Sequence, residues 1–150
     1  MKNHINQIKS KYPAYRKGHI EDDALKGKDM PNSIAKKILV IDYNEAILDV
    51  MKMIITDAGY TFISPMSDLI PEKIFDLHPD LIFIEDQLYN LPQGRKISKS
   101  LKRSALTFSI PIVMMTTSIE SKDLISESEA DTLLLKPFDI NNLEAILHCS

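Results

Sequence analysis

The sequence predicts an α/β domain in which an open parallel sheet of five strands carries helices on both faces. Short apolar runs bounded by polar residues recur along the chain, as in strands that are buried on both sides. Segments with apolar residues at three- and four-residue spacing separate these runs and predict amphipathic helices. With 150 residues, 44% of them hydrophobic, the chain is long enough to bury one core.

The expected strands and helices alternate along the chain. Strands are predicted over residues 38–41, 61–64, 81–84, 110–115 and 132–135. Helices are predicted over residues 46–55, 71–77, 97–105, 121–129 and 139–147. Gly59 ends the first helix, Pro71 opens the second and Asp139 is placed to cap the last. The third helix should bury Ile97, Leu101 and Ala105, and the fourth Leu124 and Ile125.

The amino-terminal part of the chain differs from the rest in charge and pattern. Residues 1–37 hold nine Lys and Arg against four Asp and Glu, whereas the remainder holds nine against seventeen. The first part shows no sustained apolar period. We therefore expect a basic extension over residues 1–36, solvated or folded back on an acidic domain over residues 37–150. The extension lacks a dense Lys/Arg block, so nucleic acid is not an expected partner.

Several classes of protein are disfavoured by composition. The chain has no apolar run near the roughly 18 residues of a membrane span and no signal-peptide pattern at its start, so a cytoplasmic location without membrane contact is expected. Cys149 is the single cysteine, which excludes an internal disulfide and a thiolate metal cluster. The four glycines form no phosphate-binding loop, which disfavours a small α/β phosphatase or a nucleotide-binding enzyme.

Polar side chains follow four of the predicted strands directly. Asp42 follows the first strand, Glu85 and Asp86 the third, Thr116 the fourth and Lys136 the fifth. Right-handed crossovers bring these strand ends to one edge of the sheet, where ligands bind in open α/β folds. Carboxylates bind Mg²⁺ or accept a phosphoryl group, and hydroxyl and ammonium groups bind phosphoryl oxygens. For Asp42 a second interpretation stays open, as a cap of the first helix.

Four segments carry a resemblance to a known family. They are ILVID at residues 38–42, PDLIFIE at 79–85, IPIVMMT at 110–116 and ADTLLLKPFD at 130–139. Together they resemble the receiver domain of two-component response regulators over roughly residues 36–148. The resemblance implies a flavodoxin-like sheet of order 2-1-3-4-5. It also implies a phosphoaspartate switch with bound Mg²⁺, read by Thr116 and Lys136, and a cis bond before Pro137.

The sequence departs from the family pattern at three positions. Tyr43 stands where the family has a second acid that binds the metal, so only a weak Mg²⁺ site at Asp42 and Glu85 is expected. Glu85 stands at the phosphoacceptor position, four apolar residues after Pro-Asp. Leu133 replaces the aromatic residue of the family's switch. A switch built from these residues lacks the second metal-binding acid, the phosphoacceptor aspartate and the switch aromatic of the family.

Two carboxylates compete for the phosphoacceptor position. Counting forward through the apolar strand selects Glu85, whereas counting back from Gly94 selects Asp86. Successive strand residues face opposite ways, so only one of the two can point into the pocket. Glu85 is the preferred assignment, because the upstream count is the firmer anchor, and it can meet Lys136 directly.

Two functional hypotheses follow from these alternatives. In the first, a stand-alone atypical receiver that is not an enzyme acts as a phosphorylation-independent protein-interaction module, with Glu85 at the phosphoacceptor position. In the second, a histidine kinase phosphorylates Asp86 despite weak Mg²⁺ binding. Either one needs a partner acting in trans, a histidine kinase or another signalling protein. The resemblance places partner contacts, including homodimer contacts, at residues 122–147.

Overall fold

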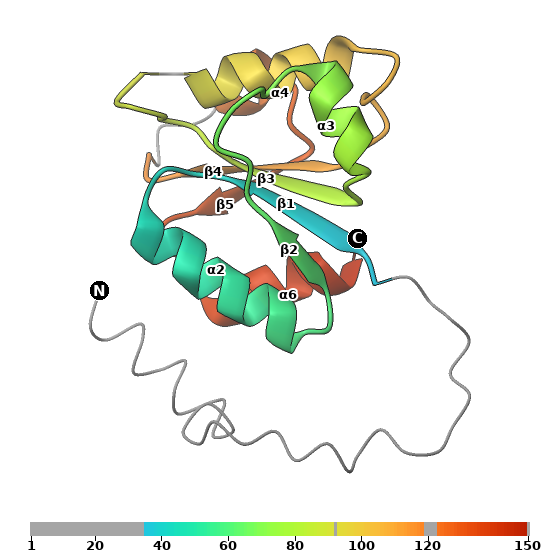
Figure 1. Cartoon of the computed structure of the whole chain (residues 1–150). Helices are drawn as coiled ribbons and strands as arrows, with labels where there is room; N and C mark the ends of the chain where they lie inside the picture. Colours follow the sequence, from blue (N-terminus) through green and yellow to red (C-terminus); the bar gives the residue numbers. More distant parts are fainter. Residues whose placement is uncertain (1–34, 92, 119–122, 150) are drawn as a thin grey trace. The chain divides into compact units, whose positions relative to one another are not determined.

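The structure is a computed structural model, and it describes residues 35–91, 93–118 and 123–149. The predicted extension over residues 1–36 lies outside this part of the chain, apart from its last two residues. Five strands are described: β1 Lys37–Ile41, β2 Thr61–Ile63, β3 Leu81–Glu85, β4 Ile112–Thr116 and β5 Thr132–Leu135. Five helices alternate with them: α2 Glu45–Asp57, α3 Pro71–Leu77, α4 Gln93–Arg103, α5 Leu124–Ser128 and α6 Ile140–Cys149 (Figure 1).

The five strands form one parallel sheet of order β2-β1-β3-β4-β5. The predicted α/β class and the strand order implied by the resemblance are therefore confirmed. The register pairs Ile41 with Ile84, Glu85 with Met115, and Thr116 with Leu135. Because these pairs lie at the strand ends, the residues that follow β1, β3, β4 and β5 reach the same edge of the sheet.

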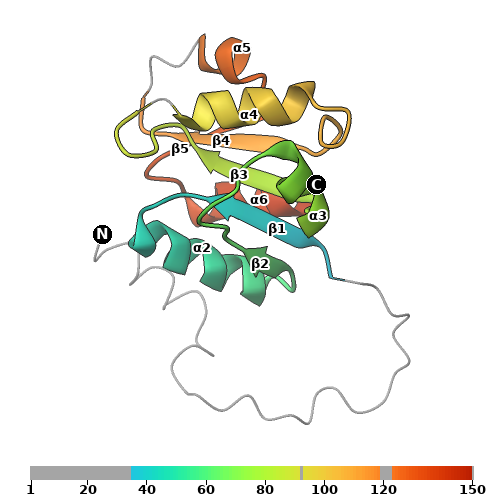
Figure 2. The same ribbon diagram turned by 45° about the horizontal axis from the view of Figure 1, so that its top comes forward.

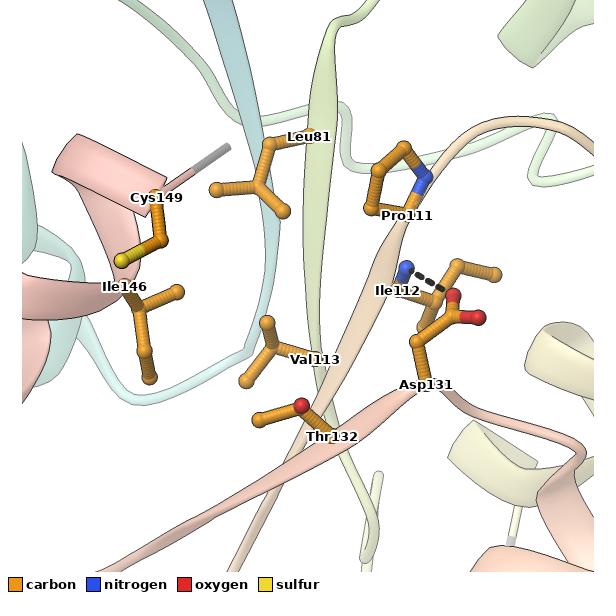
Figure 3. Close-up of a pocket in the computed structure, with 8 residues that line it drawn as sticks. All are labelled: Leu81, Pro111, Ile112, Val113, Asp131, Thr132, Ile146 and Cys149. Atoms are coloured by element: carbon orange, nitrogen blue, oxygen red, sulfur yellow. Dashed lines mark hydrogen bonds between the residues drawn. The ribbon is translucent and has the colours of Figure 1, made fainter.

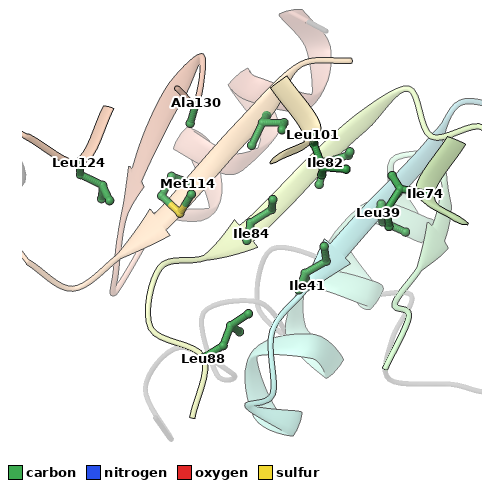
Figure 4. Packing of buried hydrophobic residues seen from close by; sticks show 11 residues of the cluster. Leu39, Ile41, Ile74, Ile82, Ile84, Leu88, Leu101, Met114, Leu124 and Ala130 are labelled. Atoms are coloured by element: carbon green, nitrogen blue, oxygen red, sulfur yellow. The ribbon is translucent and has the colours of Figure 1, made fainter. Parts of the chain in front are cut away.

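Helices cover both faces of the sheet. Figures 1 and 2 show α3 and α4 on one face and α2 and α6 on the other. On the α3–α4 face, alternate strand residues pack against these helices and α5 (Figure 4). This cluster consists of Leu39, Ile41, Ile74, Ile82, Ile84, Leu88, Leu101, Ile112, Met114, Leu124 and Ala130. Apolar burial on both faces explains why the strands read as unbroken apolar runs.

Helix α4 ends earlier than the sequence predicted. It stops at Arg103, so Ala105 lies beyond the helix and the prediction that it belongs to the buried stripe is wrong. The buried Thr107 hydroxyl donates a hydrogen bond of 2.7 Å to the carbonyl of Leu101. A side-chain bond of this kind satisfies a carbonyl that the helix end leaves free, so the chain can turn there.

Helix α5 is short and buries little. Leu124 is buried as predicted, but the prediction that Ile125 is a core contact is wrong, because 36% of its surface is exposed. Glu129 ends the helix in the left-handed region, with φ of 56°. The first residues of the predicted helix, 121 and 122, lie outside the described residues. Among the residues that are described, no helix is long and apolar enough to cross a bilayer.

Candidate functional site

Asp42 emerges from β1 with both carboxylate oxygens engaged. Its Oδ1 accepts a hydrogen bond of 2.9 Å from the backbone N–H of Asn44. Asn44 itself caps α2, because its side-chain oxygen accepts from the backbone N–H groups of Ala46 and Ile47. The interpretation of Asp42 as the cap of α2 is therefore wrong. The Oδ2 atom of Asp42 takes no part in the start of the helix.

Lys136 joins the ends of three strands. Its Nζ lies 2.7 Å from Oδ2 of Asp42 and also forms an ion pair with Oε2 of Glu85. Its backbone N–H donates a hydrogen bond of 2.7 Å to the carbonyl of Thr116, and the bond between Lys136 and Pro137 is cis. The structure thus brings Asp42, Glu85 and Lys136 into one buried charged cluster, which we call the acidic pocket.

The two adjacent carboxylates at the end of β3 point to opposite faces of the sheet. Glu85 shares its face with Phe83, two residues earlier, and reaches Lys136. Asp86 shares its face with Ile84, which packs in the cluster beneath α4. Glu85 is 8% exposed and Asp86 is 1% exposed, so neither carboxylate lies in bulk water. The structure places Glu85 in the acidic pocket and Asp86 outside it.

Asp86 is paired with an arginine that the sequence analysis did not single out. Arg95, in the first turn of α4, donates from Nε to Oδ1 of Asp86 at 2.6 Å and from Nη2 to Oδ2 at 3.1 Å. Its Nη1 also forms an ion pair with Glu127 on α5. These bonds raise the pKa of the Arg95 guanidinium, first through Asp86 and then through Glu127. Arg95 therefore holds the second carboxylate away from Lys136.

Thr116 and Leu133 complete the set of predicted positions. Thr116 is buried at the end of β4, and its hydroxyl accepts a hydrogen bond of 3.1 Å from the backbone N–H of Ser118. Leu133 is half-buried in β5 and packs against the α3–α4 face of the core. The position that the resemblance assigns to the switch aromatic is therefore filled by an aliphatic side chain in contact with the core.

Tyr43 lies over a second tyrosine. Its ring stacks on that of Tyr89, with 4.0 Å between ring centroids and 28° between planes. Tyr89 sits in a tight turn closed by hydrogen bonds between the backbones of Leu88 and Leu91, and its φ is 53°. The side chain of Tyr43, one of the three departures from the family pattern, is therefore held against the turn that follows β3. Burial raises the pKa of the Tyr43 hydroxyl.

The carboxylates of the acidic pocket fit magnesium poorly. Mg²⁺ requires near-octahedral oxygen ligands, usually from one or two carboxylates and several waters. Here Lys136 is ion-paired with both Asp42 and Glu85, and Tyr43 supplies no carboxylate. The part of the chain that the structure describes contains no group of three or more His, Cys, Asp or Glu side chains placed to hold a metal.

Burial also alters the protonation of the pocket. It raises the pKa of Glu85 above its ordinary value of 4.5, while the Lys136 ammonium lowers it in part and the charge of Asp42 adds a smaller rise. The ionised form of Glu85 is therefore less favourable here than in water.

A cavity of about 210 Å³ lies at the opposite end of the strands (Figure 3). Its lining includes Leu81, Ile112 and Thr132, each the first residue of its strand, together with Cys149. The cavity is separate from the acidic pocket, which lies at the carboxyl ends. In open α/β sheets the carboxyl ends are the usual ligand site, so the acidic pocket is the candidate functional site.

The residues that the sequence analysis missed share one signal. Helix α4 carries five Lys and Arg and no acid, whereas the segment from α5 to the start of β5 carries Glu127, Glu129 and Asp131. Arg95 pairs with Glu127, Arg103 with Glu129 and Lys102 with Asp131. The opposite charge of these two segments is the signal in the sequence that would have indicated that they meet.

Comparison with known proteins agrees with this fold. The chain is 32% identical over 117 residues to the phosphate regulon transcriptional regulatory protein PhoB of Pseudomonas aeruginosa, covering 76% of this chain and 51% of that protein. The chain thus spans about half the length of the curated relatives it matches. No protein-family model matches it.

Two solved structures share the fold. A two-component response regulator from Clostridium difficile is 28% identical, with a TM-score of 0.63, and the match covers 76% of this chain and 93% of that one. The receiver domain of a sensor histidine kinase of Pseudomonas aeruginosa, solved with a magnesium ion in its active-site cleft, is 18% identical with a TM-score of 0.62. That match covers 76% and 95% of the two chains.

The chain therefore carries a receiver domain of the response-regulator family of two-component signalling, with a flavodoxin-like fold.

Proposed function

We propose that this receiver domain is a phosphorylation-independent protein-interaction module with Glu85 at the phosphoacceptor position. The ion pairing of Lys136 with both Asp42 and Glu85 carries this proposal. In the family, this lysine contacts the phosphoryl group. Here its ammonium already has two carboxylate partners, and the glutamate extends one methylene further than an aspartate would. The pocket therefore resembles a switch that is permanently occupied.

The alternative function is that of a receiver phosphorylated on Asp86 by a histidine kinase. Asp86 is 1% exposed, and Arg95 holds both of its oxygens. A phosphodonor would have to displace the arginine before an oxygen could attack phosphorus. The Lys136 ammonium, which would bind the phosphoryl oxygens, pairs with carboxylates of the acidic pocket. These contacts favour the first function over the second.

The proposed partner is a histidine kinase or another signalling protein, bound through residues 122–147. Two apolar side chains of this region, Ile125 and Leu135, are exposed to 36% and 48%. A groove of about 490 Å³ runs between β5 and α6, with Leu135, Pro137 and Ile146 in its lining. Exposed apolar side chains beside a groove are typical of protein-binding surfaces. A second copy of the chain is the other candidate occupant of this surface.

Intact mass after incubation with acetyl phosphate and Mg²⁺ tests the function. We expect no added phosphoryl group on the native chain under conditions that label an ordinary receiver in parallel. The double variant Tyr43→Asp with Glu85→Asp restores the family's acids and should gain one phosphoryl group. Stoichiometric labelling of the native chain would overturn the proposal, and peptide mapping to Asp86 would establish the alternative.

A further inference from the structure

The acidic pocket and helix α4 are joined by the backbone at the end of β3. Glu85 and Asp86 are consecutive, so a backbone shift that follows a change at Glu85 is passed to Asp86. Helix α4 starts directly against this peptide: a Cβ atom at Gly94 would lie only 1.9 Å from the carbonyl oxygen of Glu85 and 2.9 Å from that of Asp86. The backbone N–H of Gly94 also donates to the Asp86 carbonyl at 3.2 Å. The first turn of α4 therefore has no clearance from the pocket's backbone.

Asp86 and Arg95 are held together as a unit. Two hydrogen bonds, of 2.6 and 3.1 Å, join the guanidinium to the two carboxylate oxygens. Because Asp86 is 1% exposed, losing this partner would leave a buried carboxylate unpaired, at a large cost in free energy. When the end of β3 shifts, keeping the pair intact requires Arg95 to follow.

Arg95 in turn holds α5. Its Nη1 forms an ion pair with Glu127, in the middle of that five-residue helix. In α5, Leu124 is the one buried apolar side chain, and Ile125 is exposed. A second ion pair, between Arg103 of α4 and Glu129, holds the end of α5. Ion pairs to α4 therefore contact α5 at its middle and at its end.

We propose that Arg95 couples the state of the acidic pocket to the position of α5 through the connection Asp86–Arg95–Glu127. A change at Glu85 shifts the peptide shared with Asp86, Arg95 follows its carboxylate, and Glu127 moves with Arg95. The inference rests on the proposed function only in taking the acidic pocket as the place where the domain is regulated. It assigns Arg95 as a positioning residue, because it touches neither Lys136 nor Glu85.

This connection lies where the family's own route is altered. Leu133 stands at the position of the switch aromatic, is partly buried against the core and has no aromatic ring. The Arg95 connection instead runs along the α3–α4 face and ends on α5, which belongs to the proposed partner surface. Coupling between two sites is reciprocal, so a partner that moves α5 must also change the pocket.

Amide NMR spectra of the ¹⁵N-labelled full chain test this coupling. Glu85→Gln removes the pocket charge while keeping the side-chain shape, and no phosphodonor is present. We expect it to shift the amide resonances of residues 125–128 by more than those of residues 61–63 in β2, at the edge of the sheet far from α5. With Arg95→Met as a second change, the α5 shifts should fall to the β2 level. Glu127→Gln should abolish the effect in the same way, and it serves if Arg95→Met fails to fold.

The matched control is Arg103→Met. It removes an ion pair between α4 and α5 but leaves Asp86 and Arg95 untouched, so the response of α5 to Glu85→Gln should persist. The proposal is overturned if α5 does not respond in the native background, if it responds equally after Glu127→Gln, or if Arg103→Met also removes the response. None of these outcomes depends on acetyl phosphate labelling, so failure of the coupling is distinguishable from failure of the proposed function.

Discussion

Glu85 and Asp86 are neighbours in the chain, yet they belong to two different regions of the molecule. On one face of the sheet Glu85 meets an ammonium shared with Asp42. On the other face Asp86 meets a guanidinium shared with Glu127. Burial raises the pKa of Glu85, whereas the fork of Arg95 hydrogen-bonds both oxygens of Asp86. Two carboxylates one residue apart therefore face different chemistry because the strand directs them to opposite faces.

The comparison indicates a division of tasks at the end of β3. Lys136 forms ion pairs with two carboxylates, so the acidic pocket has more carboxylates than cations and is poorly suited to a further anion. Arg95 serves one carboxylate in the loop and one on a helix, so it links two elements. The side of the sheet that carries the acidic pocket is thus an occupied site. On the other side, Arg95 connects the end of β3 to α5. The three predictions that follow test each side and the peptide between them, from the largest expected effect to the smallest.

Gly94→Ala should have the largest effect on stability, because its methyl group would overlap the Glu85 carbonyl oxygen. Overpacking against backbone cannot be relieved by a rotamer change, so we expect a loss of more than ~3 kcal/mol in the free energy of unfolding. Urea unfolding followed by circular dichroism measures it. The control is Gly59→Ala, where φ is 88° but no atom lies within 4 Å, and the strained backbone should cost only ~1–2 kcal/mol. Equal losses at the two glycines would contradict the close approach at Gly94.

Lys136→Met should cost ~2–3 kcal/mol, because it leaves the buried carboxylates of Asp42 and Glu85 without their cation. Protonation of Glu85 limits the loss. Adding Glu85→Gln to Lys136→Met should recover part of the stability, so the two changes are non-additive in a double-mutant cycle. Adding Asp86→Asn instead should bring no such recovery. Recovery with Asp86→Asn alone would mean that the assignment of the two carboxylates to opposite regions is wrong.

The smallest expected effect is on the pH dependence of stability. The pKa of Glu85 is raised in the folded chain, so between the unfolded and folded values the folded state binds more protons. Its contribution to stability is therefore full below the ordinary pKa of 4.5 and is lost as pH rises through the raised value. Glu85→Gln should remove this loss, so urea midpoints of variant and native chain should diverge in the variant's favour with rising pH. A difference independent of pH would contradict a raised pKa.

Much of the fold followed from short-range patterns in the chain. Apolar runs such as 38–41 and 81–84 could only be buried strands, and the helix over residues 71–77 was marked by Pro71. The misses came from tertiary contacts. Ala105 lies beyond the end of α4, where the Thr107 hydroxyl donates to the Leu101 carbonyl, and Ile125 is 36% exposed because α5 has only five residues and directs Leu124 to the core.

The residues of the candidate site could also be named from the sequence, because each follows a strand and parallel strands bring their carboxyl ends to one edge. The sequence left open which carboxylate enters the pocket, since Glu85 and Asp86 have the same chemistry and the two counting anchors disagreed. Only the tertiary structure decided it. The register of β3 turns Glu85 toward Lys136. Arg95 lies nine residues after Asp86 and comes close enough to pair with it only once α4 has packed on the sheet. Opposite charge on two segments can indicate that they meet, but it does not say which residues pair, so the partner of Asp86 could be identified only in the folded protein.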